Sequence, residues 1–353
     1  MESPATLPMT PPEPPLRLTL DTNALVHNWR ALDRLSGSAR AGAAVKADAY
    51  GLGARRVVEA LAEAGCRDFF VAYASEAAEL QGLIEPGQVS ILHGPQSADE
   101  ANWIATHSFR PVINSVRQAG LWADAGNGPC DLMVDTGINR LGVAMTDLSA
   151  PAIAALDVRT VHSHLASADE DSPLNAQQLA RWRSACEQVG QGEGSLANSA
   201  GIMLGSDYHG DLTRPGLALY GGVPCAGLAS EIRQVAVPEA VIMQVRNVAA
   251  GESIGYNATF VAAQEMRVGV VALGYADGYM RCWSGKGVMR ADEAHLPVLG
   301  RVSMDMTVID LSAAPYLSEG DWVRLDYALP EAARISSLSQ YELLTLLGRR
   351  FAR

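Results

Sequence analysis

The stretch AAVKADAYGLG, residues 43–53, places a lysine inside a short apolar segment that is typical of a buried strand. Burying an ammonium without a partner costs several kcal/mol, and proteins respond by lowering the pKa of the amine or by converting it to an imine. Either outcome makes Lys46 a nucleophile. The chain has one other lysine, Lys286, while its remaining cationic side chains are Arg. The alternative is a lysine at a strand end that extends into solvent.

Tyr50, Gly51 and Gly53 follow Lys46 and precede a helix predicted over residues 55–64. A glycine-containing turn between a strand and a helix can bring backbone N–H groups close to a phosphate. The G-x-G spacing alone is a weak indication, so the surrounding elements decide how it is interpreted.

Strand and helix patterns alternate along residues 43–222. Eight strand signals separated by helices favour a closed parallel (β/α)₈ barrel of the TIM type, with an open doubly wound sheet as the alternative. A helix over 23–35, capped by Asp21, precedes them. The predicted strands are 43–47, 68–73, 89–93, 110–113, 131–135, 160–165, 195–199 and 217–222, and the helices between them are 55–64, 75–82, 97–106, 115–125, 175–189 and 200–204.

The carboxyl ends of parallel barrel strands share one mouth, where active sites are built. Polar residues gather at these predicted ends. Ser199 and the sequence RPG (214–216) suit the phosphate-binding corner that barrels place at their seventh and eighth strands. A lysine facing a phosphate corner suggests pyridoxal 5'-phosphate (PLP). Taken alone, His164 is equally well a core histidine and Arg140 a surface cation. The set comprises Lys46, Tyr50, Asp135, Arg140, His164, Asn198, Ser199, Arg214, Gly216 and Tyr220.

After Gly222 the pattern changes to short alternating strands, which predict a separate all-β domain over residues 235–353. Its strands are expected at 239–248, 266–274, 295–299, 306–310 and 322–325, and a terminal helix at 340–351. Residues 1–16 contain six prolines and little that could pack, which predicts a disordered tail. The barrel is therefore expected over 17–234.

The composition favours small soluble ligands. A net charge of -12, a pI near 5.0 and the absence of basic runs argue against nucleic acid and anionic membranes as partners. Five widely spaced cysteines without a C-x-x-C pair indicate reduced thiols and neither a disulfide framework nor a metal site. No apolar run is long enough to span a membrane, and the first residues lack a signal-peptide pattern, so a cytoplasmic location is expected.

Several strings in order along the chain resemble those of the alanine racemase family, whose members combine a PLP-binding barrel with a β domain. The resemblance covers about residues 17–353. Its strings are AAVKADAYGLG (43–53), VDTGINRLGV (134–143), HSHLASADE (162–170), ANSAG (197–201), TRPGLALYG (213–221), IGYNATF (254–260), GYADGY (274–279), GRVSMDM (300–306) and YELLTLLGRR (341–350).

The resemblance implies racemisation of L- and D-alanine by two bases on opposite faces of the α-carbon. Lys46 would hold PLP through an imine and act as one base, and Tyr256 of the partner subunit would be the other, in a homodimer with shared active sites. His164 would also link Arg214 toward the tyrosine, and Asp305 would support the region from the partner chain. The implied cofactor-binding residues are Lys46, Tyr50, His164, Asn198, Ser199, Arg214, Gly216, Leu217 and Tyr341, and the implied substrate-binding residues are Arg140, Met304 and Tyr275.

Two positions depart from the family pattern. Met133 stands where many members carry a carbamylated lysine that orients the arginine, here Arg140, and Ser303 stands where many have Cys. The first departure raises the question of what supports Arg140, for which a bound anion or Asn139 could substitute.

Three alternatives remain open at this point. The chain could be a PLP-dependent racemase of another small amino acid such as serine, an amino-acid decarboxylase of the same fold type, or a PLP-binding protein without turnover. Proteins of the last kind lack the β domain, and the presence of Tyr256 and Met304 therefore favours an enzyme. The sequence leaves open whether the reaction serves D-alanine biosynthesis or L-alanine catabolism.

Overall fold

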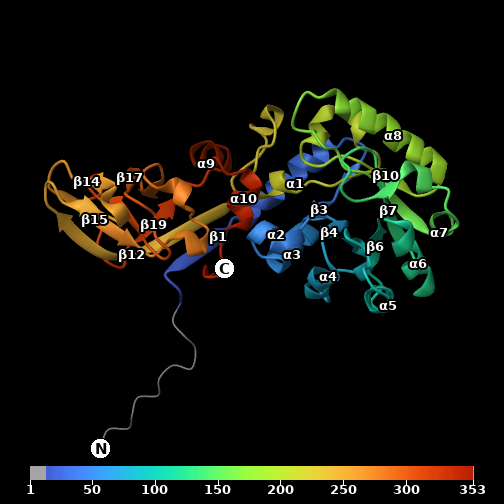
Figure 1. The fold of residues 1–353 in the computed structure, drawn as a ribbon, viewed down its shortest axis with the longest axis horizontal. Coiled ribbons are helices and arrows are strands. Elements are labelled where there is room, and N and C mark those ends of the chain that lie inside the picture. The colour runs from blue at the N-terminus through green and yellow to red at the C-terminus, as the bar shows by residue number, and fades with distance from the viewer. Residues whose placement is uncertain (1–12, 353) are drawn as a thin grey trace, which may run out of the picture. The chain divides into compact units, whose positions relative to one another are not determined.

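The computed structural model describes residues 13–352, which divide into two compact units. One unit runs from Asp21 to Val235, and the other combines residues 13–20 with residues 236–352 (Figure 1). The break near residue 235 lies one residue from the predicted boundary. No helix within the described residues is long and apolar enough to cross a membrane.

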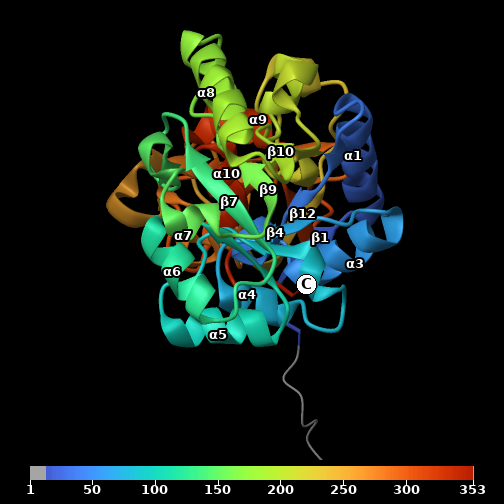
Figure 2. The same cartoon turned by 90° about the vertical axis from the view of Figure 1, so that its right-hand side faces the viewer.

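The first unit is a parallel barrel whose strands lie inside a ring of helices (Figure 2). Its main sheet has the order β10-β9-β7-β6-β5-β4-β3, with β8 beside β7, and β11 pairs with β2. The strands are β2 (Arg40–Ala41), β3 (Ala43–Ala44), β4 (Phe69–Val71), β5 (Val89–Ile91), β6 (Arg110–Ile113), β7 (Cys130–Asp135), β8 (Val143–Ala144), β9 (Val158–His162), β10 (Glu193–Ser195) and β11 (Leu212–Thr213).

Backbone hydrogen bonds close this barrel. The Gly42 N–H donates to Thr213 O (2.9 Å) and the Ala43 N–H donates to Asp68 O (2.8 Å), so residues 40–44 form one continuous strand between β11 and β4. The Arg214 N–H donates to Ala197 O (2.8 Å) and joins the last strand to the one before it. With residues 40–44 counted as one strand and the short β8, which pairs only with β7, left out, the described chain forms the predicted (β/α)₈-type barrel.

Most barrel helices form where the sequence periodicity predicts them, whereas the short α2 (Lys46–Gly51) and α7 (Pro151–Ala154) were not predicted. Helix α1 begins after Asp21, whose carboxylate accepts a hydrogen bond from the Ala24 N–H (2.9 Å) as the predicted N-cap, and it buries Leu25, Trp29 and Leu32. The helices of this unit are α1 (Thr22–Leu35), α2 (Lys46–Gly51), α3 (Ala54–Ala64), α4 (Ala74–Glu79), α5 (Ala98–Thr106), α6 (Val116–Asp124), α7 (Pro151–Ala154) and α8 (Pro173–Val189).

Three predictions in the barrel are wrong. The strand predicted over 43–47 ends at Ala44, because the residues from Lys46 onward form a turn. Residues 217–222 do not form the eighth strand, because Leu217–Tyr220 is a buried 3₁₀ turn and the strand is the earlier β11. A short apolar run is compatible with a buried turn as well as a buried strand, and Gly221, with φ of 93°, ends this one as a turn. The helix predicted over 200–204 is also a 3₁₀ turn, Gly201–Leu204.

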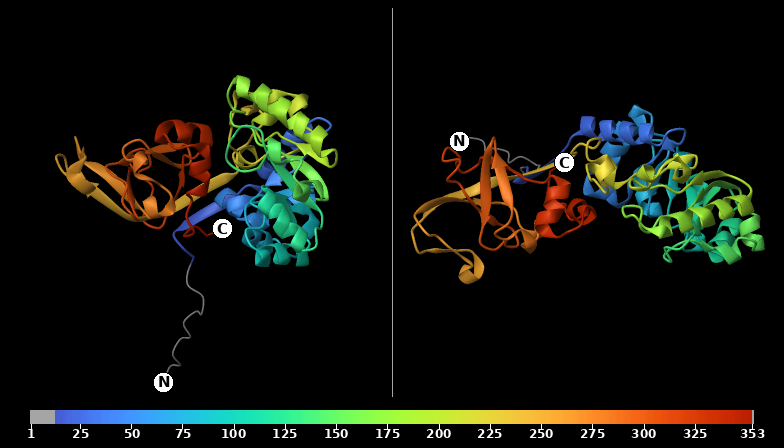
Figure 3. Two further views of the ribbon diagram at one scale, coloured as in Figure 1. Left: turned by 45° about the vertical axis from the view of Figure 1, so that its right-hand side comes forward. Right: turned by 90° about the horizontal axis from the view of Figure 1, so that it is seen from above.

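The second unit is an antiparallel barrel built around the long strand β12 (Figure 3). The strand order is β1-β12-β15-β18-β17-β16-β19, and β19 returns to pair with β12. Its elements are β1 (Leu16–Leu20), β12 (Ala236–Val248), β13 (Ser253–Ile254), β14 (Phe260–Val261), β15 (Met266–Val271), β16 (Val288–Ala291), β17 (Ala294–Leu299), β18 (Thr307–Asp310), β19 (Trp322–Leu325), α9 (Leu329–Ser336) and α10 (Gln340–Thr345).

The first described strand belongs to this second unit and corrects the predicted start of the barrel. Residues 17–20 were expected in the barrel, but β1 pairs with β12, with Leu16 opposite Ala240. Its alternating pattern buries Leu16, Leu18 and Leu20 against the β unit. The predicted disordered tail lies mostly on residues 1–12, outside the described residues, and Leu16 at its end is ordered within a strand.

Candidate active site

Lys46 begins a turn with left-handed backbone conformation rather than lying within a strand. The strand ends at Ala44, and four successive residues, Ala47 to Tyr50, have φ between 52° and 57°. This conformation costs L-residues about 1–2 kcal/mol each, so the surroundings must hold it. The turn places Lys46 and Tyr50 at the carboxyl end of the first barrel strand.

Two carboxylates anchor this turn. Glu76 accepts hydrogen bonds from the backbone N–H groups of Ala47 (2.8 Å) and Ala72 (2.6 Å), which ties the turn to the end of the next strand. Asp48 accepts a hydrogen bond from the Ala54 N–H (2.7 Å) at the start of α3. The turn is therefore fixed at both ends. The backbone position from which the Lys46 side chain extends is fixed with it.

The surroundings of Lys46 favour its neutral amine. Burial lowers the pKa of Lys46, and the positive charge of Arg140 lowers it further, while Glu76 opposes the shift. A lysine with a lowered pKa supplies the unprotonated amine that nucleophilic and general-base chemistry require. The sequence-based prediction of a nucleophilic lysine is supported by this environment.

A polar corner forms where Ser199 meets the turn after β11. The Ser199 hydroxyl oxygen accepts hydrogen bonds from the N–H groups of Gly216 (3.0 Å) and Ala218 (3.2 Å), which leaves its O–H free to donate. A Cβ added at Gly216 would lie 2.3 Å from the Tyr50 hydroxyl oxygen, so only glycine allows this approach. Tyr50, Ser199, Gly216 and the adjoining Leu217 thus lie together, and their role as a phosphate site remains a prediction.

Arg214 lies in the barrel interior beside this corner and is 7% exposed. Burial lowers its pKa to about 10, so it remains a cation at neutral pH. One terminal nitrogen donates to the carbonyl (2.7 Å) and hydroxyl (2.5 Å) of Ser195, and the other donates to the carbonyl of Ser163. A guanidinium held in this way presents a fixed positive charge.

His164 follows β9 and lies near the same cations. Burial, with the positive charges of Arg214 and Arg140, lowers its pKa to about 3. The imidazole is therefore neutral at ordinary pH and can take part in hydrogen bonds but does not carry a charge. Its predicted place beside Arg214 agrees with this electrostatic coupling.

Two predicted barrel residues have less support. The Asn198 side-chain oxygen accepts a hydrogen bond from the Gly201 N–H (2.9 Å), which is a structural role in the turn after β10. Arg140 is exposed in the single chain, whereas Met133 is buried in β7. An exposed guanidinium is solvated by water, so within the single chain Arg140 needs neither a bound anion nor Asn139 to balance its charge.

The β unit brings its own predicted residues together on neighbouring loops. The N–H groups of Tyr275 and Ala276 donate to the carbonyls of Ser303 and Met304, both at 3.0 Å. A Cβ at Gly255, next to Tyr256, would lie 3.4 Å from the Arg301 N atom at the start of the same loop. Tyr256, Tyr275 and Met304 therefore belong to one cluster of loops within this unit.

Three predicted residues of the β unit are apolar or aromatic yet exposed. The exposed fractions of Tyr256, Met304 and Tyr341 are 64%, 53% and 45%. Large exposed side chains on ordered loops are typical of surfaces that bind another molecule. Asp305 pairs with Arg350 (2.8 Å), which also contacts Asp277 (2.6 Å), and this link fixes the end of the Met304 loop.

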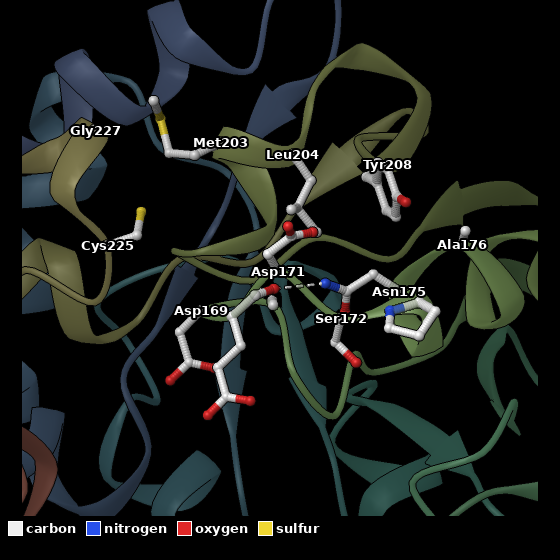
Figure 4. A pocket seen from close by; sticks show the side chains of 13 residues that line it. Asp169, Asp171, Ser172, Asn175, Ala176, Met203, Leu204, Tyr208, Cys225 and Gly227 are labelled. Atoms are coloured by element: carbon white, nitrogen blue, oxygen red, sulfur yellow. Dashed lines mark hydrogen bonds between the residues drawn. The ribbon is translucent and has the colours of Figure 1, made fainter.

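A cavity of about 750 Å³ lies beside the start of α8 in the barrel unit (Figure 4). Its wall includes three successive carboxylates at positions 169–171 together with Asn175, Tyr208 and Cys225. Carboxylates repel a phosphate, and none of the predicted site residues lines this cavity. The chemistry of the strand ends, and not the size of this cavity, therefore identifies the candidate site.

The prediction from sequence missed a set of buried polar residues beneath Arg214. The Nδ1 atom of His162 lies 3.2 Å from a terminal nitrogen of Arg214. Its Nε2 atom lies 3.5 Å from a carboxylate oxygen of Asp131. Both side chains are fully buried. The available signal was a charged or ionisable residue inside an otherwise apolar strand segment, which costs free energy unless it is paired.

Comparisons with known proteins match both units. Residues 20–224 match the family model of the alanine racemase N-terminal domain, and residues 235–353 match that of the alanine racemase C-terminal domain. A biosynthetic alanine racemase of Agrobacterium fabrum is 40% identical over 365 residues, covering 96% of this chain and 93% of the relative. A catabolic alanine racemase of the same organism is 38% identical over 353 residues, covering 95% and 91%.

Comparison with solved structures points to the same family. The structure of alanine racemase from Bartonella henselae with covalently bound pyridoxal phosphate has a TM-score of 0.88 and 33% identity, covering 97% of this chain and 99% of that one. Biosynthetic alanine racemase from Pseudomonas aeruginosa has a TM-score of 0.86 and 36% identity, with the same coverage. Both units and their order along the chain match this group, and the chain belongs to the alanine racemase family.

Proposed function

We propose that this chain interconverts L-alanine and D-alanine with PLP as its cofactor. The observation that carries the proposal is the convergence of Lys46, the Ser199–Gly216 corner and Arg214 at the carboxyl ends of the barrel strands, in a chain of this family. A biosynthetic and a catabolic relative match it almost equally, which fits a reaction that runs in both directions.

The residues present fit PLP. Gly216 leaves room where a Cβ would meet the Tyr50 hydroxyl, and the Ser199 O–H is free to donate to a phosphate oxygen. Lys46 has the lowered pKa that covalent attachment of an aldehyde requires, and Arg214 supplies a cation near the same mouth. When bound, PLP supplies the electron withdrawal that acidifies the α-carbon of the amino acid.

Two bases are assigned to opposite faces of the α-carbon. Lys46 removes or returns the proton on one face, and Tyr256 of the partner subunit does so on the other. Tyr50, Ser199, Gly216, Leu217 and Tyr341 bind the phosphate.

The remaining predicted residues orient the reacting groups. Arg214 would face the pyridine nitrogen of bound PLP, and Asn198 and His164 would support this part of the site. Arg140, Met304 and Tyr275 orient the substrate, with Asp305 holding the Met304 loop.

The proposed assembly is a cytoplasmic homodimer. Lys46 lies in the barrel unit, whereas Tyr256, Tyr275 and Met304 lie in the β unit, where the side chains of Tyr256 and Met304 are exposed. A second copy of the chain that covers those loops would complete two equivalent sites by symmetry.

The test is a spectrum and a racemisation assay on the purified full chain. We expect an absorbance band from bound PLP that is removed by borohydride, with the reduced adduct mapped to the peptide carrying Lys46. Conversion of L-alanine to D-alanine should exceed that of serine. Racemisation of serine in preference to alanine would replace the substrate assignment, and bound PLP without turnover of either would overturn the enzymatic one.

A further inference from the structure

A buried polar network crosses the barrel beneath the proposed mouth, and the reaction described above does not use it. Ser90 on β5, Asp131 on β7 and His162 on β9 have no exposed surface, and Arg110 on β6 lies beside them. Buried polar groups of this kind cost free energy unless they are paired, so their arrangement calls for a reason.

The contacts run in one line toward Arg214. The Ser90 hydroxyl donates to Asp131 Oδ2 (2.6 Å), and Arg110 Nε lies 3.4 Å from the same oxygen. His162 Nε2 lies 3.5 Å from Asp131 Oδ2, and His162 Nδ1 lies 3.2 Å from Arg214 Nη1. The ring of Phe70 meets the His162 ring edge to face, with centroids 5.8 Å apart, and limits its rotation.

The chemistry of the two partners determines the protonation of His162. A guanidinium only donates hydrogen bonds, so the contact with Arg214 requires an unprotonated Nδ1 that accepts. The proton of the neutral ring then sits on Nε2, which faces the carboxylate of Asp131. An ionised carboxylate only accepts, so the two neighbours select the same tautomer.

The charges around the pair support this state. Burial lowers the pKa of His162, although Asp131 opposes the shift, so the ring is neutral at ordinary pH. Burial alone would raise the pKa of Asp131, but the charge of Arg110, the nearby His162 and the hydrogen bond from Ser90 outweigh this and lower it. Asp131 is therefore ionised and His162 neutral.

Arg214 has no direct carboxylate partner among the described residues. Its terminal nitrogens contact Ser195, Ser163, His162 and, at 3.5 Å, the Leu196 carbonyl, and none of the described residues accepts a hydrogen bond from its Nε. The guanidinium plane is thus fixed while its charge is not cancelled by a contacting anion. This arrangement suits a cation that must act on a ligand at the mouth.

We propose that Asp131 and His162 are positioning residues for Arg214: Asp131 selects the Nε2–H tautomer of His162, whose Nδ1 then holds the guanidinium toward the cofactor. The proposal rests on the proposed function, because it takes Arg214 to face the pyridine nitrogen. Neither residue touches the reacting atoms.

The tautomer can be measured directly. In full-length protein with ¹⁵N-labelled histidine, with and without PLP, we expect the His162 signals, assigned by their loss in His162→Asn, to show an unprotonated Nδ1 and a protonated Nε2. In Asp131→Asn this preference should weaken. A protonated Nδ1 in the wild-type chain would overturn the proposal, whatever the catalytic activity.

Two substitutions separate the role of the acceptor from that of volume. His162→Asn keeps an oxygen in the place of Nδ1, whereas His162→Leu has similar size and no acceptor. We expect His162→Leu to bind PLP about tenfold more weakly, to alter the absorbance of the bound cofactor and to lower kcat more than it changes KM, because a buried charged donor loses its partner. His162→Asn should restore most of each property.

His209 provides the matched control. It is also buried in the barrel unit, but its ring nitrogens contact the carbonyls of Ser36 (2.9 Å) and Ile202 (2.8 Å) and not Arg214. His209→Leu should destabilise the fold without altering the cofactor spectrum of the protein that remains folded. Equal spectra for His162→Leu and His162→Asn would refute the proposal in a chain that racemises alanine, whereas failure of the wild type to racemise would refute the proposed function alone.

Discussion

Lys46 shows how a charged residue in a buried position can indicate a chemical role. An ammonium at the end of a buried strand is penalised by desolvation, and the neighbouring charge of Arg140 adds to the penalty. The protein has retained it all the same, in a chain with one other lysine. The free energy that the charged form loses is what makes the neutral amine available for attachment and proton transfer.

The two lysines allow this to be tested by titration. After reductive ¹³C-methylation of PLP-free protein, the lysine signal that disappears in Lys46→Arg and persists in Lys286→Arg should titrate below the ordinary lysine value of 10.5. The direction follows from desolvation, which disfavours the protonated form. Lys46→Arg should also lower kcat by at least about a thousandfold, because an arginine cannot act as the base. Titration of the Lys46 signal at or above 10.5 would contradict this account.

At the scale of an element, the left-handed turn from Ala47 to Tyr50 is strained but anchored. Glu76 and Asp48 hold its backbone from two directions, and Tyr50 is placed against Gly216 as a result. Functional sites commonly retain such strain where neighbouring contacts compensate for it. The turn fixes the distance between the lysine and the phosphate corner.

Replacing an exposed residue of this turn by glycine should stabilise the protein. In Ala47→Gly the left-handed conformation no longer carries a Cβ, and we expect the free energy of unfolding to rise by about 0.5 kcal/mol, since the gain is partly offset by the freer unfolded chain. Ala60→Gly in the helix α3 is the control and should lower it by about 0.5–1 kcal/mol. Urea denaturation of both variants measures this, and a loss of stability in Ala47→Gly would show that the turn is not strained.

At the scale of the whole molecule, the predicted site residues are divided between two units. The barrel carries Lys46, Ser199 and Arg214, and the β unit carries Tyr256 and Met304 on exposed loops. A division of this kind links activity to assembly, because each unit holds one of the two proposed bases.

Subunit mixing tests this division. Lys46→Ala and Tyr256→Phe should each be nearly inactive as homodimers, whereas heterodimers formed by exchange should recover activity at one of their two sites, up to about half of the wild-type value per heterodimer. Recovery is measured after mixing under conditions where exchange is verified by mass labels. Verified exchange without recovery would mean that both bases act from the same chain.

The sequence alone located most of the helices and strands. It also singled out the residues of the candidate site. Periodicity located α1, with its Asp21 cap, and the alternation of strands and helices in the barrel. The unusual lysine and the strings around Ser199 and Arg214 indicated the chemistry before any contact was known. These features are local, since they depend on residues a few positions apart.

Tertiary structure decided the features that depend on distant residues. The pairing of β1 with β12 joins segments more than two hundred residues apart, and no local pattern in residues 16–20 names that partner. The eighth strand is β11 and not the predicted residues 217–222. A short apolar run in the sequence does not distinguish a strand from a buried turn. The series of contacts Asp131–His162–Arg214 arises only when β7, β9 and the residue after β11 come together in the barrel, because such contacts depend on positions in space and not on spacing along the chain.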